Sequence, residues 1–181
     1  MWGRPANAVV RVKTSSRTFK SHTRGSVAVE FAMIALPLVM LICGCLELAM
    51  VILLSVTLDN ATDVVSRDIR TGIITQGNTT ATAFRQKICD KMGWLSNSCM
   101  SSLSIDVQTY ATFADVPKTD LIQNGQYQTF TFSIGTGSNI QMVRAYYEWP
   151  LITPFLKAGM SKMTNGDAVI TSKVIFRNEP F

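Results

Sequence analysis

The most prominent pattern in the chain is a long apolar stretch near its start. Residues 26–58 carry only two charged side chains, Glu30 and Glu47. A helix crosses the hydrocarbon core of a bilayer with about 20 apolar residues, so this stretch is long enough to span a membrane. The alternative, a core helix of a water-soluble protein, would need covering on all sides, which a 181-residue chain could hardly provide. The pattern therefore predicts a transmembrane segment over residues 26–58.

The pattern changes after this segment. Helical periodicity continues through Ala61, Val64, Val65 and Ile69, and it predicts that the helix runs on to a stop at Gly72. Further along, the pattern predicts a helix over 80–92, strands over 103–107, 127–134, 140–149 and 168–176, and a short helix or turn over 151–160. These elements predict an α+β fold. A long N-terminal membrane-spanning helix continues into a small exported domain with an antiparallel sheet.

The charges give this segment an orientation. Six of the chain's 17 basic residues lie within residues 1–25, with no acidic residue among them: Arg4, Arg11, Lys13, Arg17, Lys20 and Arg24. Basic flanks stay in the cytoplasm, so we expect a cytoplasmic leader at 1–25, the transmembrane segment at 26–58 and an exported domain at 59–181. The rest of the chain has 11 basic against 12 acidic residues, which argues against nucleic-acid binding.

Other N-terminal signals fit less well. A cleaved secretory signal has a shorter apolar core that starts sooner and is followed by a small-residue cleavage site. A lipoprotein-type site with an acylated Cys45 stays open as an alternative, although it would need a long charged leader and a glutamate in the apolar core.

The four cysteines divide between two environments. Cys43 and Cys45 lie in the apolar stretch, two residues apart, where we expect them to act as small hydrophobic residues. Cys89 and Cys99 lie in the exported part, where oxidation is permitted, and we favour a disulfide between them. Two buried free thiols are the alternative.

The sequence offers no recognisable catalytic machinery. His22 is the only histidine, and it lies in the leader, so the exported domain has no histidine for a nucleophilic or metal site. Asp115 and Asp120 lie in a proline-containing loop and are typical of solvated turn residues. We therefore expect a protein that is not an enzyme and holds no metal or cofactor.

The residues around Glu30 form the most specific motif. The order is a basic leader, Gly25, Ser26, an apolar run, Glu30 and the aromatic Phe31. An acidic group near the middle of a membrane span costs about 2.5–3.5 kcal/mol, and less toward the interface. Taken alone, Glu30 is explained by an interfacial position near the positive end of the helix dipole. Taken together, these residues resemble the processing site of class III (type IV-like) prepilins.

The chain as a whole resembles TadE-like pseudopilins, the TadE/TadF family of Flp/Tad type IV-like pilus assembly. The resemblance rests on Gly25, Glu30, Phe31, Pro37, the segments 44–47 and 58–61, Trp149-Pro150-Leu151 and the C-terminal segment 174–181. Flp pilins usually have a tyrosine after the glutamate, whereas Phe31 keeps the ring and lacks the hydroxyl.

The resemblance implies a minor pilin-like structural subunit with a pilin-like exported domain. Its processing site would be Gly25, Ser26, Glu30 and Phe31, with an aspartyl prepilin peptidase cutting between Gly25 and Ser26. Gly25 is expected to interrupt the helix, so that an extended backbone enters the protease cleft. The freed ammonium group of Ser26 would lie one helical turn from Glu30, where it, or that of a neighbouring subunit, could pair with the carboxylate.

The resemblance also implies the partners and the location. The implied partners are the prepilin peptidase, other TadE/TadF-like pseudopilins, the Flp pilin, the inner-membrane assembly platform and membrane lipid. The chain would be a single-pass protein of the bacterial inner membrane with a periplasmic C-terminal domain, or would enter the pilus itself.

Three questions stay open at this level. The chain could instead be an uncleaved single-pass membrane protein whose exported domain binds a ligand or another envelope protein. Glu47 could contact a second membrane subunit, or it could mark the outer end of the hydrocarbon region. A role at the filament tip, in priming assembly or in the membrane is not distinguished.

Overall fold

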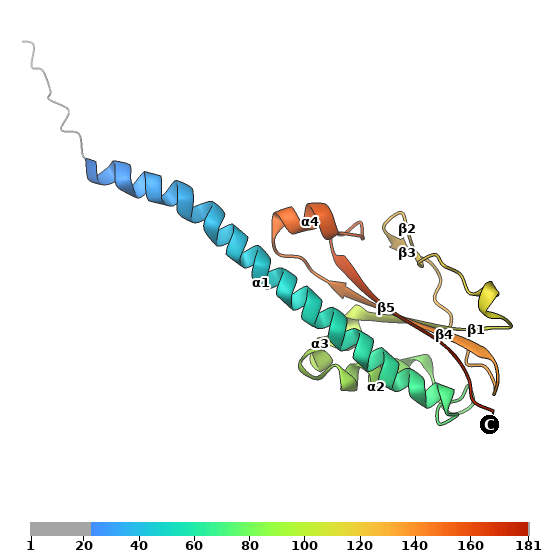
Figure 1. The fold of residues 1–181 in the computed structure, drawn as a ribbon. Coiled ribbons are helices and arrows are strands. Elements are labelled where there is room, and N and C mark those ends of the chain that lie inside the picture. The colour runs from blue at the N-terminus through green and yellow to red at the C-terminus, as the bar shows by residue number, and fades with distance from the viewer. Residues whose placement is uncertain (1–22, 181) are drawn as a thin grey trace, which may run out of the picture. The chain divides into compact units, whose positions relative to one another are not determined.

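A computed structural model describes residues 23–180 of the chain. Most of the predicted cytoplasmic leader, His22 included, lies outside the described residues. The chain divides into two units, residues 1–38 and 39–181, which are considered separately here. The described part of the first unit is helical and belongs to α1 (Thr23–Arg70). The second unit contains the rest of α1 and all the other elements (Figure 1).

The helix α1 has 48 residues and includes Pro37. It ends where the sequence predicts, because Gly72 adopts a left-handed backbone with a φ of 76°. The Gly72 N–H donates to the carbonyl of Ile69 at 3.1 Å. Arg67 and Arg70 lie in the last turn, where positive charge interacts favourably with the helix dipole. The predicted continuation of the apolar helix to Gly72 is confirmed.

The second unit is built on a three-stranded antiparallel sheet. Its strands are β1 (Leu103–Tyr110), β4 (Ile140–Trp149) and β5 (Ala168–Arg177), in the order β1-β4-β5. Val107 pairs with Val143, and Val143 pairs with Val174. The predicted α+β fold with an antiparallel sheet is confirmed.

One face of this sheet packs against the C-terminal half of α1 (Figure 1). A stripe of side chains along α1 is at most 1% exposed: Leu54, Leu58, Ala61, Val65 and Ile69. Their spacing of three or four residues places them on one side of the helix, where burial of each larger side chain contributes about 1.5–3 kcal/mol. Val64 is 42% exposed, so its predicted place in this stripe is wrong.

Two short helices complete this side of the core. α2 (Ala81–Lys91) starts where Thr80 accepts a hydrogen bond from the Ala83 N–H at 3.2 Å. A 3-10 turn, η1 (Gly93–Leu95), and α3 (Ser96–Ser102) follow. The predicted helix over 80–92 is confirmed, whereas the periodicity did not reveal α3.

The predicted strand over 127–134 is wrong for most of its length. The segment forms a single parallel bridge with β1, between Phe132 and Val107. Side chains bind two of its N–H groups: Asp106 accepts from Thr131 at 2.8 Å, and Gln76 accepts from Ile134 at 2.8 Å. Because side chains meet these backbone donors, no continuous ladder forms despite the alternating sequence.

The remaining elements are short. They are η2 (Phe113–Asp115), β2 (Ile122–Gln123), β3 (Gln126–Tyr127) and α4 (Pro154–Met160). β2 and β3 form a hairpin through Asn124 and Gly125, which both have positive φ angles. Asn-Gly is the preferred pair for this type of two-residue turn. The predicted helix or turn over 151–160 is confirmed as α4.

Candidate functional site

The predicted processing site lies in the first turns of α1. The helix begins at Thr23, so Gly25 is a helical residue, and the prediction that it interrupts the helix is wrong. The first N–H groups of any helix lack intrahelical partners. A glycine in this turn therefore weakens the helix only through its low helix propensity, which costs about 1 kcal/mol relative to alanine. Apart from its chain neighbours and the nearby backbone of its own helix, no described atom lies within 4 Å of the position that a Gly25 Cβ would take. The bond after Gly25 therefore lies in an end turn that is open on the glycine side.

The helix also fixes the spacing within this motif. The backbones of Ser26 and Glu30 are four residues apart on one helix, which places them on the same face one turn apart. The side chain of Ser26 lies outside the described residues. Glu30 and Phe31 are exposed. An ammonium group created at position 26 would thus lie within one turn of the Glu30 carboxylate.

The part of α1 that follows is apolar and exposed. Ten large apolar side chains between residues 27 and 46 are more than half exposed: Val27, Val29, Phe31, Met33, Ile34, Leu36, Leu38, Val39, Leu41 and Leu46. Soluble monomers rarely expose contiguous apolar surface on this scale. Among the described residues there is one helix long and apolar enough to cross a membrane, and it is α1. These features indicate a single-pass membrane protein.

Glu47 is the first charged residue after this run, and it is buried. Its carboxylate accepts hydrogen bonds from the backbone N–H groups of Ile152 at 2.5 Å and Thr153 at 2.8 Å. These N–H groups immediately precede α4, so Glu47 fastens the start of α4 to α1. A partner within the same chain was not among the two interpretations that the sequence suggested.

Replacing Glu47 with glutamine is expected to lower the free energy of unfolding by about 1–3 kcal/mol, because a charged group that accepts two backbone N–H bonds, one on each oxygen, becomes a neutral group with one acceptor oxygen. Urea unfolding of the full chain in detergent would measure this loss. Hydrogen exchange at the Ile152 and Thr153 amides should accelerate. The control Glu179→Gln alters a half-exposed ion pair with Arg70 and should have a smaller effect. Unchanged exchange at both amides would contradict this role.

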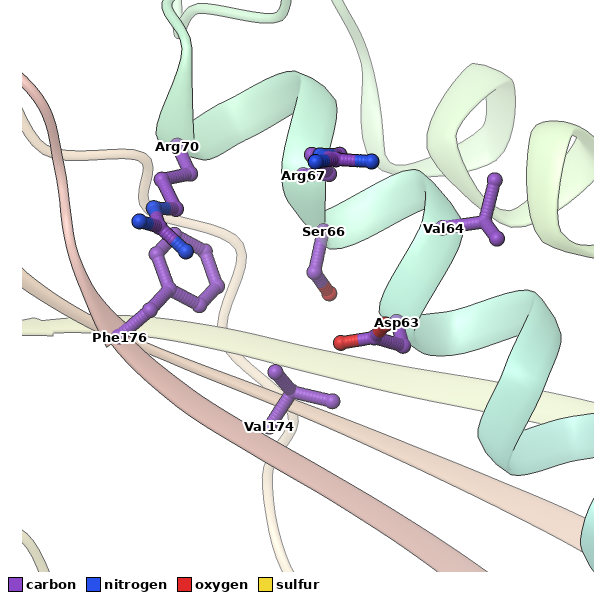
Figure 2. A pocket seen from close by; sticks show the side chains of 7 residues that line it. All are labelled: Asp63, Val64, Ser66, Arg67, Arg70, Val174 and Phe176. Carbon is purple, nitrogen blue, oxygen red and sulfur yellow. The ribbon is translucent and has the colours of Figure 1, made fainter.

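A shallow groove lies between α1 and β5. Its volume is about 320 Å³, and it is lined by Asp63, Val64, Ser66, Arg67, Arg70, Val174 and Phe176. Figure 2 shows Arg70 beside the ring of Phe176, and Ser66 and Asp63 facing Val174. Arg70 forms an ion pair with Glu179 at 3.5 Å. The groove carries charges of both signs and no nucleophile–base pair, so it offers no basis for assigning a reaction.

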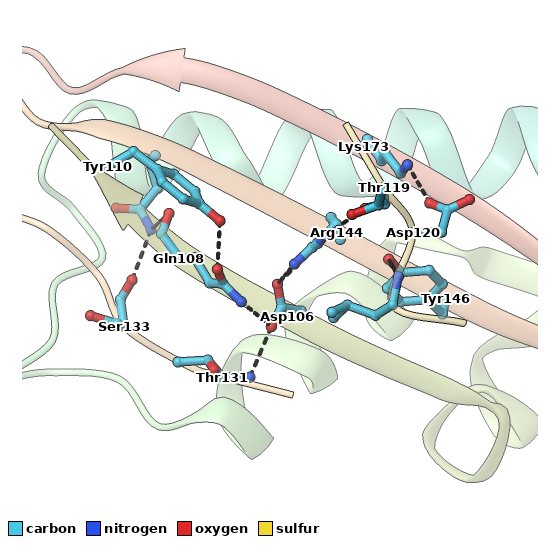
Figure 3. Close-up of polar contacts among 12 residues, drawn as sticks. Asp106, Gln108, Tyr110, Thr119, Asp120, Thr131, Ser133, Arg144, Tyr146 and Lys173 are labelled. Carbon is cyan, nitrogen blue, oxygen red and sulfur yellow. Dashed lines mark hydrogen bonds and ion pairs between the residues drawn. The ribbon is translucent and has the colours of Figure 1, made fainter. Parts of the chain in front are cut away.

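A buried polar network covers the opposite face of the sheet (Figure 3). Asp106 on β1 accepts from the Nε and Nη2 atoms of Arg144 on β4 at 3.0 and 2.7 Å. Both side chains are at most 2% exposed. The second oxygen of Asp106 accepts from the Thr131 N–H and from the Gln108 amide. The network attaches the loop before β4 to the sheet, and the sequence analysis did not identify it.

Two tyrosines near this network, the buried Tyr146 and the partly buried Tyr127, have raised pKa values. Burial raises the pKa of Tyr146, whose hydroxyl accepts from the Leu121 N–H at 3.3 Å. Burial, and then the charge of Glu148, raises the pKa of Tyr127. Raised tyrosine pKa values favour the neutral hydroxyl, so these groups are suited to packing rather than to acting as bases.

The two loop aspartates have structural partners. Asp115 is exposed and accepts from the N–H and hydroxyl groups of Thr112. Asp120 is partly exposed and forms an ion pair with Lys173. They do not act as a pair, because each binds a different group.

The cysteines follow the predicted division. Cys89 and Cys99 form a disulfide with a Cα–Cα distance of 5.5 Å, and Cys43 and Cys45 are free and exposed. Within residues 23–180, no group of three or more histidine, cysteine or acidic side chains is arranged to hold a metal ion.

A comparison with known families finds a match over most of α1. Residues 25–67 match the family model described as TadE-like protein. The matched segment begins at Gly25 and contains Glu30, Phe31 and Glu47. No curated protein and no solved structure matches the chain. The match supports the resemblance found in the sequence and points to a membrane protein related to the Tad pilus.

Proposed function

We propose that this TadE-like chain is a minor pilin-like structural subunit of Flp/Tad pilus biogenesis, anchored in the bacterial inner membrane. The observation that carries the proposal is the family match over residues 25–67, which coincides with the exposed apolar helix and its N-terminal motif. The leader 1–25 lies in the cytoplasm in this proposal, and the domain after the span lies in the periplasm. A structural rather than catalytic role agrees with the TadE-like match.

The anchor is the apolar run at the start of α1. Residues 27–46 form 20 helical positions, which rise about 30 Å and match the hydrocarbon core of a bilayer. From Glu47 onward, one side of the same helix packs on the sheet. The membrane-crossing part of the predicted segment 26–58 is thus its first two thirds, and the last third belongs to the exported domain.

Processing would change the charge of this anchor. A cut by a prepilin peptidase between Gly25 and Ser26 removes six basic residues and leaves a single ammonium group at Ser26. Gly25 lies in the first turn, which lacks intrahelical acceptors for its N–H groups and therefore frays easily. An unwound first turn supplies the extended backbone that a protease cleft requires.

Glu30 would then set the position of one subunit against another. A carboxylate within the apolar part of a helix is costly in lipid, and an amine from a neighbouring processed subunit relieves that cost. The pair specifies register more than it adds stability. Other TadE/TadF-like pseudopilins, the Flp pilin and the assembly platform are the proposed partners.

The N-terminal residue of the protein from native membranes tests the processing step. Edman sequencing or intact mass should give a chain that starts at Ser26. Gly25→Val should block cleavage by placing a side chain at the cut, while the open space around Gly25 leaves the fold unaffected. Gly77→Val is the matched control, because Gly77 is equally open and lies outside the motif. A wild-type chain that retains residues 1–25 would favour an uncleaved membrane protein with a periplasmic interaction domain.

Replacing Glu30 with alanine should leave cleavage intact and impair pilus assembly, because the acid that pairs with the processed terminus is lost. Intact mass would report cleavage, and electron microscopy would count surface pili. Asp59→Ala removes an exposed carboxylate from the same helix and should leave both measurements unchanged. Normal piliation by the Glu30→Ala variant would contradict the register role.

A further inference from the structure

The start of α4 contacts α1 within a single turn of that helix, around residues 44–47. Glu47 binds the N–H groups of Ile152 and Thr153. A Cβ added to Gly44 would collide with the ring of Phe155, so the glycine permits the ring to approach the α1 backbone closely. Figure 1 shows α4 beside α1. These contacts place α4 next to residues 44–47 of α1.

This attached segment exposes two large apolar side chains. Ile152 is 84% exposed and Phe155 is 52% exposed. Their neighbours Leu151, Thr153 and Leu156 are buried, so the segment is well fixed to the core. One side of the Phe155 ring lies against Gly44 and the rest is exposed, whereas Ile152 is exposed over most of its surface. The segment is therefore fixed to α1 and still has an exposed apolar surface that a lipid or protein partner could cover.

Basic side chains accompany these apolar ones. Lys157 lies within α4, and Lys162 follows it; both are exposed. Ile152, Phe155, Lys157 and Lys162 are called the α4 surface below. Apolar side chains with adjacent lysines are typical of elements that lie in the interfacial region of a membrane.

The α4 surface contacts α1 at the residues where the proposed membrane span ends. The part of the apolar run that is exposed on all sides ends at Leu46, since Glu47, Val51 and Leu54 are buried against the rest of the second unit, although Ile52 and Val56 on the other side of the helix stay exposed. A span that begins at Val27 reaches the outer edge of the hydrocarbon core about 30 Å later, at residues 44–47. The α4 surface is attached at these residues, so it lies where acyl chains give way to headgroups.

We propose that the α4 surface inserts into the outer interface of the membrane that α1 crosses. Ile152 and Phe155 enter the boundary between headgroups and acyl chains, and Lys157 and Lys162 contact anionic headgroups. The inference rests on the proposed membrane anchor. Continuity with the apolar run and the two lysines favour a lipid surface over a protein partner as the occupant.

This contact would give the exported domain a defined height and rotation. A single helix leaves the domain free to rotate about the helix axis, and interfacial side chains are what set tilt and rotation in membranes. With a second contact beside the helix, the domain presents a constant face to other subunits before assembly.

Spin labels on the full chain in vesicles test the inference. Cys43 and Cys45 are replaced by serine, the Cys89–Cys99 disulfide is kept, and one nitroxide is attached through Ile152→Cys. Ile73→Cys is the matched control, because Ile73 is also exposed but lies beyond the other end of the domain part of α1. Leu36→Cys reports the anchor itself. The vesicles contain phosphatidylethanolamine and phosphatidylglycerol.

Collisions with oxygen, which enters lipid, are compared with collisions with a water-soluble nickel chelate. Position 152 should favour oxygen and position 73 the nickel chelate. The charge-reversed variant Lys157→Glu/Lys162→Glu should shift position 152 toward the nickel chelate. The same shift is expected in vesicles of phosphatidylcholine alone.

The outcomes separate this inference from the anchor. If position 36 favours oxygen while position 152 is as accessible to nickel as position 73, the interfacial contact is overturned and the anchor stands. A label at 152 that is immobile and shielded from both reagents would mean a protein occupant, which also overturns the inference. If position 36 itself is in water, the proposed anchor fails.

Discussion

Replacing Asp106 with alanine is expected to lower the free energy of unfolding by about 3–5 kcal/mol, because Arg144 is left as a buried charge without its partner. The same change removes the acceptor for the Thr131 N–H, so the loop before β4 should detach from the sheet. Urea unfolding of the full chain in detergent would measure the loss. Hydrogen exchange at Thr131 would report the loop.

Two variants make this prediction specific. Asp120→Ala removes an ion pair on a partly exposed Lys173, where solvent screening limits the loss to less than about 1 kcal/mol. In Asp106→Leu/Arg144→Met, both charges are replaced by apolar side chains, so no buried charge is left without a partner. The double variant should unfold at higher urea than Asp106→Ala, although the Thr131 N–H stays without its acceptor. Equal losses in Asp106→Ala and Asp120→Ala would show that burial of the pair contributes nothing.

The elements that the sequence predicts correctly are those with a strong local pattern. α1 combines an apolar run with a glycine stop, and β4 and β5 are ten-residue segments rich in β-branched and aromatic residues. The alternation over 127–134 is just as regular, yet the segment makes only one bridge. Two of its backbone donors, at Thr131 and Ile134, are bound by the side chains of Asp106 and Gln76 from elsewhere in the chain. A local pattern cannot encode where such distant acceptors will lie.

The same distinction applies to the candidate site. The motif from Gly25 to Phe31 is contiguous, so it can be found without a structure. The contact of Glu47 with Ile152 and Thr153 joins residues more than a hundred positions apart, and only the fold brings them together. Asn124-Gly125 is a local signal for a two-residue hairpin turn, like the contiguous motif at Gly25. The strand predicted over 127–134 did not include this turn, so the β2–β3 hairpin was missed.

The Cys89–Cys99 disulfide lies on the helical side of the core. It joins α2 to α3 across ten positions of sequence, and both cysteines are fully buried. The sequence could predict this bond because the predicted compartment of the domain, outside the cytoplasm, is one where disulfides persist. Its stabilising effect comes mainly from restricting the unfolded chain, and for a loop of this size it amounts to about 3 kcal/mol.

Replacing both Cys89 and Cys99 with alanine should therefore lower the free energy of unfolding by about 3 kcal/mol, measured by urea unfolding of the full chain in detergent. A thiol reductant should destabilise the wild-type protein by a similar amount and leave the double variant unchanged, which separates the loss of the bond from the loss of packing. Cys43→Ala/Cys45→Ala is the matched control, because these cysteines are free and exposed. A wild-type transition that is identical with and without reductant would mean that the bond does not stabilise the second unit.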